Sequence, residues 1–170
     1  SLEIYPYEYF INLKDILFCF FKIFLFKLNL HKLNIYDLDL SSLIKKEFFR
    51  SYTSINSYAF YYSIRNLIKF HKNIHKTFLT YENRSWENMF IKSFRDYSIN
   101  TKIIGYQHSV VYQASAGYYL CENDEFIKPL PDILLTNGSI TREKILKYSF
   151  CKETFVKKSC ALRYEYLDKF

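Results

Sequence analysis

Glycine and proline are scarce in this chain of 170 residues, which contains only 3 of each. The glycines form neither a G-x-G-x-x-G dinucleotide fingerprint nor a P-loop, so the sequence gives no support for NAD or ATP binding. The four cysteines are Cys19, Cys121, Cys151 and Cys160, and they include no C-x-x-C pair. We therefore expect free thiols in a reducing compartment, which indicates a cytoplasmic protein without a disulfide framework.

A dense basic block is also missing, although the net charge is +7 and the pI is about 9.1. The lysines are spread along the chain, which favours a solvated basic surface over a nucleic-acid groove. His71 and His75 have a four-residue spacing that suits metal binding, but no third ligand accompanies them. We therefore predict no metal, no bound cofactor and no nucleic-acid partner for this chain.

Aromatic residues, in contrast, are abundant, with 17 Tyr and 17 Phe. Because Ile, Lys and Asn are also frequent, the codon usage of an A/T-rich genome accounts for much of this excess. The aromatic content is therefore a weak indicator of function. The length suits one domain with an additional helical segment.

Three short apolar runs dominate the middle of the chain, and each ends in a polar or glycine-containing turn. They are FLTYE (78–82), TKIIGYQHS (101–109) and DILLTNG (132–138). Helical patterns at 85–97 and 140–148 follow the first and third runs, a helix is expected over 57–76, and a weaker strand over 154–160. This alternation predicts an α/β fold, a Rossmann-like parallel sheet flanked by helices, over residues 57–160.

Residues 1–56 are predicted to be a helical segment packed on that domain. Within it, residues 10–30 are strongly apolar but are interrupted by Lys14, Asp15, Lys22 and Lys27, which argues against a simple membrane span. Two interpretations fit: a helix lying on a membrane surface with its lysines reaching outward, or a helix packed against the core or a partner. Residues 161–170 are expected to begin an interdomain linker, which would make the chain part of a longer protein.

Ligands of parallel α/β sheets collect outside the carboxyl ends of the strands. Glu82, His108 and the turn Asn137-Gly138-Ser139 all fall at those ends. An imidazole there can accept the proton of a hydroxyl nucleophile, although a histidine that only hydrogen-bonds within its loop is an equal alternative. Glu82 can orient His108, or it can simply stabilise the start of the next helix. Gly138 permits close backbone approach to a ligand, and the irregular stretch 109–131 is long enough to be functional.

Several short motifs carry a resemblance to a known family. YENRSWE (81–87), TKIIGYQHS (101–109), PLPDILLTNG (129–138) and ALRYEYL (161–167) resemble segments of bacterial surface-carbohydrate biosynthesis proteins. The resemblance is to the amino-terminal half of GT-B-type glycosyltransferases that act on capsule or O-antigen glycans. It implies an acceptor-side domain that works with a second, donor-binding domain, which is missing from this sequence.

The resemblance also implies roles for individual residues. His108 would be the catalytic base and Glu82 its partner or an acceptor ligand. Arg163 would either neutralise a donor phosphate or form an interdomain salt bridge, and GT-B enzymes commonly need no metal. The remaining expected substrate-binding residues are Gln107, Ser109, Asn137, Gly138 and Ser139.

The implied partners are a nucleotide sugar, a glycan acceptor and the cytoplasmic face of the inner membrane. Two other functions fit the sequence. One is a non-catalytic α/β module that binds a glycan or a protein. The other is a transferase of glycerophosphate or another polyol phosphate.

Overall fold

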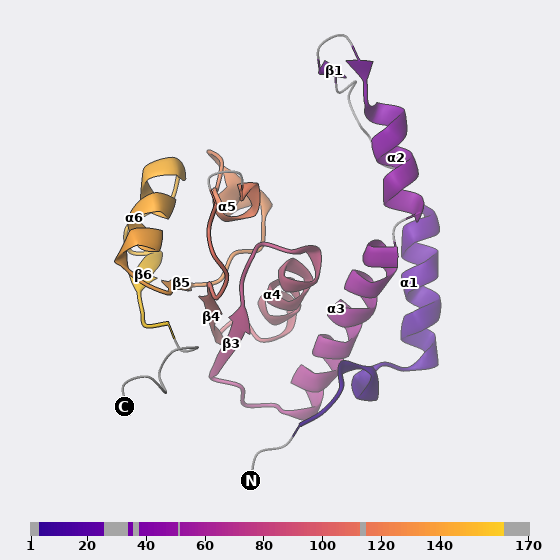
Figure 1. The fold of residues 1–170 in the computed structure, drawn as a ribbon. Helices are drawn as coiled ribbons and strands as arrows, with labels where there is room; N and C mark the ends of the chain where they lie inside the picture. The colour runs from indigo at the N-terminus through magenta and orange to yellow at the C-terminus, as the bar shows by residue number, and fades with distance from the viewer. Residues whose placement is uncertain (1–3, 26–33, 36–37, 51, 113–114, 162–170) are drawn as a thin grey trace, which may run out of the picture.

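A parallel sheet of four strands lies at the centre of the protein, as the computed structural model of the chain shows (Figure 1). The structure describes residues 4–25, 34–35, 38–50, 52–112 and 115–161. The strands of this sheet are β3 (Lys76–Thr80), β4 (Lys102–Tyr106), β5 (Ile133–Thr136) and β6 (Val156–Lys158). They are adjacent in chain order, and every pairing is parallel.

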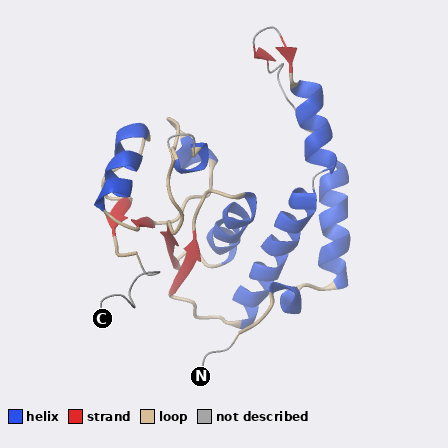
Figure 2. Cartoon of the chain, in the orientation of Figure 1, coloured by secondary structure: helices blue, strands red, loops and turns tan. Residues whose placement is uncertain are grey.

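Helices flank this sheet and extend from one side of it (Figure 2). The α-helices are α1 (Leu13–Leu25), α2 (Ser41–Arg50), α3 (Tyr52–Phe70), α4 (Ser85–Tyr97), α5 (Asp124–Ile127) and α6 (Ser139–Tyr148). Two short 3-10 helices are η1 (Tyr7–Phe10) and η2 (Ala116–Tyr118). A small antiparallel hairpin of β1 (Asn34–Ile35) and β2 (Leu38–Asp39) stands away from the sheet at the amino-terminal end of α2 (Figure 1).

The core explains why the short apolar runs become strands. Ile103 and Ile104 are neighbours in β4 and therefore point to opposite faces, yet both are buried. Both faces of this central strand are thus covered, which is the usual environment of parallel strands. Ile91 and Phe94 of α4, with side chains from α3, β5, α6 and β6, complete one continuous apolar cluster.

The expected α/β class is confirmed, and α4 has the predicted bounds of 85–97. β4, β5 and β6 are shorter than the runs that predicted them, because only part of each run is paired in the sheet. β3 has the length of the run 78–82 but is shifted by two residues toward the amino terminus. Tyr81 and Glu82 therefore lie beyond its carboxyl end. The run 109–131 is not wholly irregular, since it contains η2 and α5.

The helix expected over 57–76 begins earlier and ends earlier, as α3. It therefore crosses the expected boundary between residues 56 and 57, and it leaves His71 and His75 outside the helix. The predicted apolar helix of residues 10–30 is α1, and residues 26–30 of that prediction lie outside the described residues. The amino-terminal segment contacts α3 directly, since the Tyr7 hydroxyl donates to Asn56 Oδ1 at 3.0 Å.

All four cysteines are free thiols. None of the helices in the described part of the chain combines the length and the apolar character needed to cross a bilayer.

Candidate functional site

The carboxyl edge of the sheet brings together the segments that follow β3, β4 and β5. Backbone pairing continues one residue past the first two strands: Tyr81 N–H donates to Tyr106 O at 2.9 Å, and Gln107 N–H donates to Leu135 O at 2.8 Å. The chain then turns away from the sheet at Glu82 and at His108. Glu82 and His108 therefore occupy matching positions, each two residues past the end of its strand.

The turn between β3 and α4 is built around a buried carboxylate. Glu87, in the first turn of α4, has 1% of its surface exposed, and one of its oxygens accepts the backbone N–H groups of Glu82 and Arg84, each at 2.8 Å. Burial raises the pKa of Glu87, whereas these two backbone hydrogen bonds favour its ionised form. Asn83 between them adopts a left-handed φ of 60°. Glu87 thus fixes the path of the turn that presents Glu82.

The loop after His108 folds back against this turn. Val111 and Tyr118 are buried in the main core and anchor the loop at both ends. Gly117 approaches the turn so closely that a Cβ atom there would lie 2.7 Å from Glu82 O. Only glycine permits this contact, because a backbone oxygen has little freedom to withdraw.

A pocket of about 860 Å³ opens between the turn and the loop. This volume lies within the range of small-molecule sites, and the walls combine aromatic rings with a few polar groups. The lining residues are Glu82, Asn83, Arg84, Tyr106, His108, Ser109, Val110, Tyr112, Ser115, Gly117, Tyr118, Asn137 and Ala161.

Glu82 is the electrostatic centre of the pocket. Its Oε2 accepts Arg84 Nη2 at 2.8 Å and Nε at 3.0 Å, and its Oε1 lies 3.8 Å from His108 Nε2. A hydrogen bond from the Ser109 side chain, followed by that from Arg84, lowers the pKa of Glu82. The carboxylate is therefore ionised at neutral pH and faces the imidazole.

Ser109 links Glu82 to the loop, because its Oγ lies 2.9 Å from the Tyr118 hydroxyl. Burial raises the pKa of Tyr118 to about 12, so this phenol keeps its proton and can donate it to Ser109. The Ser109 hydroxyl can then donate a hydrogen bond to the Glu82 carboxylate. The imidazole of His108 stands at the open side of this arrangement, with 39% of its side chain exposed.

The predicted site residues divide into three groups. Glu82, His108, Ser109 and Asn137 line the same pocket. Gln107 is fully buried, and its amide is engaged with Ser109 O and with the backbone N–H of Asn137. Gln107 therefore holds the two loops together instead of facing the pocket.

Gly138 and Ser139 do not line this pocket in the described part of the chain, and Arg163 lies outside the described residues. Gly138 has a φ of 152°, which a side chain would strain, so it shapes the start of α6. Arg84 and Tyr118 were not predicted as site residues. Arg84 resembles an ordinary residue before a helix, and Tyr118 enters the site only through the fold of a long loop.

The polar groups of the pocket can bind a hydroxylated molecule and exchange a proton with it. A group of three or more His, Cys, Asp or Glu side chains suited to a metal ion is not found among the described residues. No protein-family model, curated protein or solved structure matches the chain. Fold and site together define an α/β protein with a four-stranded parallel sheet and a pocket at its carboxyl edge.

Proposed function

We propose that this chain is the acceptor-side domain of a glycosyltransferase that moves a sugar from a nucleotide-sugar donor to a bacterial surface glycan. The observation that carries the proposal is the approach of Glu82 Oε1 to His108 Nε2, at 3.8 Å, within an open pocket. The motif resemblance supports the assignment of the reaction, and the pocket supplies a suitable base. The fold supports it only at the level of an α/β sheet with a site at its carboxyl edge.

The aromatic side chains of the pocket support a carbohydrate ligand. Tyr106, Tyr112 and Tyr118 contribute rings and hydroxyl groups to the wall, and such amphipathic surfaces suit molecules with apolar faces and polar rims. Tyr112 is 67% exposed, so its ring is free to cover a ligand. An acceptor hydroxyl placed between this ring and His108 would be within reach of the base.

In the proposed reaction, the acceptor oxygen attacks the anomeric carbon of the donor as the bond from that carbon to the diphosphate oxygen breaks. His108 accepts the proton of the attacking hydroxyl, and the ionised Glu82 stabilises the resulting imidazolium. Arg84 holds Glu82 in place through two hydrogen bonds. The donor would be bound by a further domain, and Arg163 is proposed to reach its phosphates.

The test is a sugar-transfer assay on the longest protein that the gene encodes, with surface oligosaccharides and a panel of nucleotide sugars. We expect His108→Ala to lower kcat by roughly 10²- to 10⁴-fold, which is the usual contribution of a general base. His75→Ala is the matched control, because His75 is exposed and precedes β3 at the opposite edge of the sheet. Normal transfer by the His108 variant would contradict the proposal.

A non-catalytic glycan-binding module is the second candidate. It is favoured by the engagement of Glu82 with Arg84 and by the 3.8 Å separation from His108, which is longer than a hydrogen bond. This function predicts oligosaccharide binding to residues 1–170 that weakens in Tyr112→Ala and survives in His108→Ala, without transfer by the intact protein. A polyol-phosphate transferase would be recognised by its donor in the same panel.

A further inference from the structure

The contact of α1 with the rest of the protein is limited to a narrow stripe. Asp15, Cys19 and Ile23 are the buried residues of this helix, and their four-residue spacing places them in one row. The row faces α3, because the Asp15 carboxylate pairs with Arg65 and accepts a hydrogen bond from Asn66, both of that helix. The other faces of α1 point away from α3.

Polar contacts fix this orientation. Asp15 Oδ1 accepts Arg65 Nη2 at 2.5 Å, and Asp15 Oδ2 accepts Asn66 Nδ2 at 2.7 Å. Asn12 caps the helix, since its Oδ1 accepts the Asp15 N–H at 2.9 Å. The helix is thus held at its amino-terminal end and cannot rotate its apolar side inward without breaking a buried ion pair.

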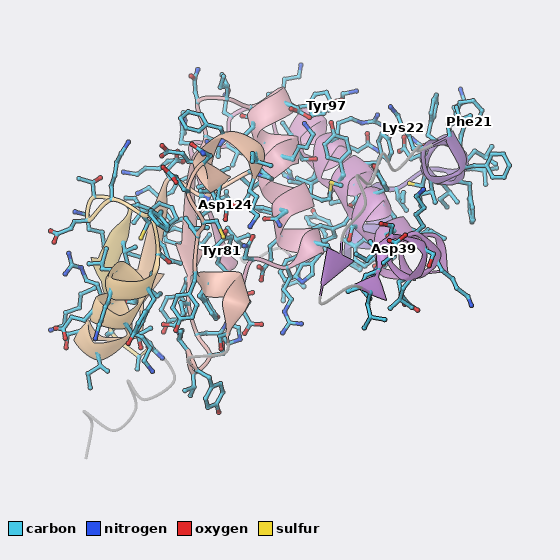
Figure 3. The ribbon with its side chains drawn as sticks, turned by 90° about the horizontal axis from the view of Figure 1, so that it is seen from above. Phe21, Lys22, Asp39, Tyr81, Tyr97 and Asp124 are labelled. Atoms are coloured by element: carbon cyan, nitrogen blue, oxygen red, sulfur yellow. The ribbon has the colours of Figure 1, made fainter. Side chains whose placement is uncertain are left out.

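The outer face of α1 is consequently an exposed apolar surface. It consists of Leu13, Leu17, Phe18, Phe20, Phe21, Phe24 and Leu25, each of which is at least 55% exposed, and Phe24 reaches 87%. Figure 3 shows Phe21 at the outer edge of the molecule, on the side of α1 away from α4. A contiguous surface of this kind marks a binding interface in a folded protein.

Further exposed aromatic residues lie in η1, just before α1, and at the end of α3. Tyr9 of η1 is 67% exposed and Phe70 at the end of α3 is 65% exposed. Phe10 joins them, with its ring centroid 5.2 Å from that of Tyr9 and 5.9 Å from that of Phe70. Tyrosine at the margin of an apolar face is typical of helices that meet a membrane interface, where one end of the ring is apolar and the other is wet.

The charges around this face indicate what covers it. Lys14 and Lys22 are exposed on α1, whereas Asp15, the single acid among the described residues of that helix, is buried and paired. Glu8 of η1 is the exposed acid that precedes it. The partner therefore combines an apolar interior with a negatively charged surface, which is the chemistry of an anionic lipid bilayer.

A second copy of the chain fits this surface less well. In a two-fold antiparallel pair of α1 helices centred on Phe18, Lys14 of one copy would approach Lys22 of the other, and a parallel pair would align like residues. Both arrangements place cations together in an apolar contact. In a bilayer, the same lysines extend their stems and place their ammonium groups among the phosphates.

We propose that α1 docks the protein on an anionic phospholipid bilayer, with the helix parallel to the membrane plane and its outer face among the acyl chains. Because the row of Asp15, Cys19 and Ile23 holds one side of α1 against the protein, the helix meets the bilayer with its outer face and lies along the interface. This inference depends on α1 and its charges, and it is independent of the proposed transferase reaction.

The test is co-sedimentation of the 170-residue chain with phosphatidylglycerol–phosphatidylcholine vesicles and with pure phosphatidylcholine vesicles. We expect stronger binding to the anionic vesicles, and a loss of roughly tenfold or more in Phe21→Asp/Phe24→Asp. Lys14→Gln/Lys22→Gln should reduce the preference for anionic vesicles. Phe126→Asp/Phe150→Asp is the matched control, because Phe126 and Phe150 are 81% and 74% exposed elsewhere on the protein. Circular dichroism and thermal unfolding verify that each variant is folded.

Each other outcome overturns the proposal. Equal loss in the control variant would mean that general surface hydrophobicity drives the binding. Equal affinity for neutral and anionic vesicles would remove the role of the lysines. A chain that ignores both vesicles but forms a dimer by analytical ultracentrifugation, with the dimer lost in Phe21→Asp/Phe24→Asp, would show that a second copy covers α1. A monomeric chain that binds neither type of vesicle would indicate that a different protein covers α1.

Discussion

At the scale of single residues, Glu82 is the point at which the fold and the chemistry of the pocket meet. Its backbone N–H is held by Glu87, its Oε2 is held by Arg84, and its Oε1 faces His108. The same residue is therefore positioned by the turn and available to the pocket. Changing its charge while keeping its shape separates the two roles.

Glu82→Gln is expected to alter the pH dependence of stability. The folded protein lowers the pKa of Glu82 from its ordinary value of 4.5, so the carboxylate stabilises the fold above that pH. This contribution is lost as the pH falls through the lowered value. The difference in melting temperature between wild type and Glu82→Gln should be largest near pH 7 and should shrink as the pH falls below 4.5. A difference that does not vary with pH would contradict the assignment.

Ser109→Ala tests the cause of that shift within the same experiment. The Ser109 hydrogen bond is the largest contribution to the lowered pKa of Glu82. Its removal should therefore move the acid-induced loss of stability to higher pH, while the Arg84 pair remains.

At the scale of elements, the turn from β3 into α4 depends on a side chain of the helix. Two backbone N–H groups of the turn have Glu87 as their acceptor, and that carboxylate is buried. A buried donor that loses its acceptor costs about 1–3 kcal/mol. The start of α4 is thus a structural support for the site.

Glu87→Ala is expected to destabilise the protein by about 2 kcal/mol, measured by chemical denaturation, because both N–H groups lose their acceptor. Glu87→Gln should cost less, since an amide oxygen still accepts. Lys92→Ala is the matched control on the same helix: its pair with Asp96 is exposed, and such pairs contribute about 0.5 kcal/mol. Equal effects of Glu87→Ala and Lys92→Ala would show that the turn does not rely on Glu87.

The elements were predictable from the sequence to different degrees. The bounds of α4 were predicted because its apolar residues follow the helical period and a strong polar turn precedes it. Three strands were predicted too long and β3 was predicted two residues too late, since an apolar run does not reveal which of its residues pair. Placing Glu82 and His108 at one edge followed from the parallel alternation alone. Tyr118 could not be placed, because it enters the site beside the contact of Gly117 with the turn, which joins segments far apart in the chain. The pairing of Arg84 with Glu82 depends on the left-handed turn at Asn83, which the sequence pattern did not reveal.

At the scale of the whole molecule, the ion pair of Asp15 with Arg65 joins the amino-terminal helix to the domain. The Asp15 side chain is 4% exposed and that of Arg65 is 19% exposed. Removing one partner of a buried pair leaves the other charge uncompensated. The attachment of α1, and with it the orientation of its outer face, should therefore depend on Asp15.

Asp15→Ala is expected to lower the free energy of unfolding by about 3 kcal/mol, because Arg65 and Asn66 lose their acceptor. Hydrogen exchange should show reduced protection of α1, with the sheet less affected. Glu153→Ala is the control, since its pair with Arg142 is on the surface and Glu153 is 82% exposed. Unchanged protection of α1 in the Asp15 variant would mean that apolar packing alone holds the helix.

The order of the strands has a consequence for how the protein is made. Because β3, β4, β5 and β6 are neighbours in the same order as in the chain, each new strand pairs with the one that left the ribosome just before it. No strand must wait for a distant partner, and amino-terminal segments are synthesised first. The wall of the pocket from Glu82 to Tyr118 is released before β5 begins, so much of the site can assemble while the rest of the sheet is still being translated.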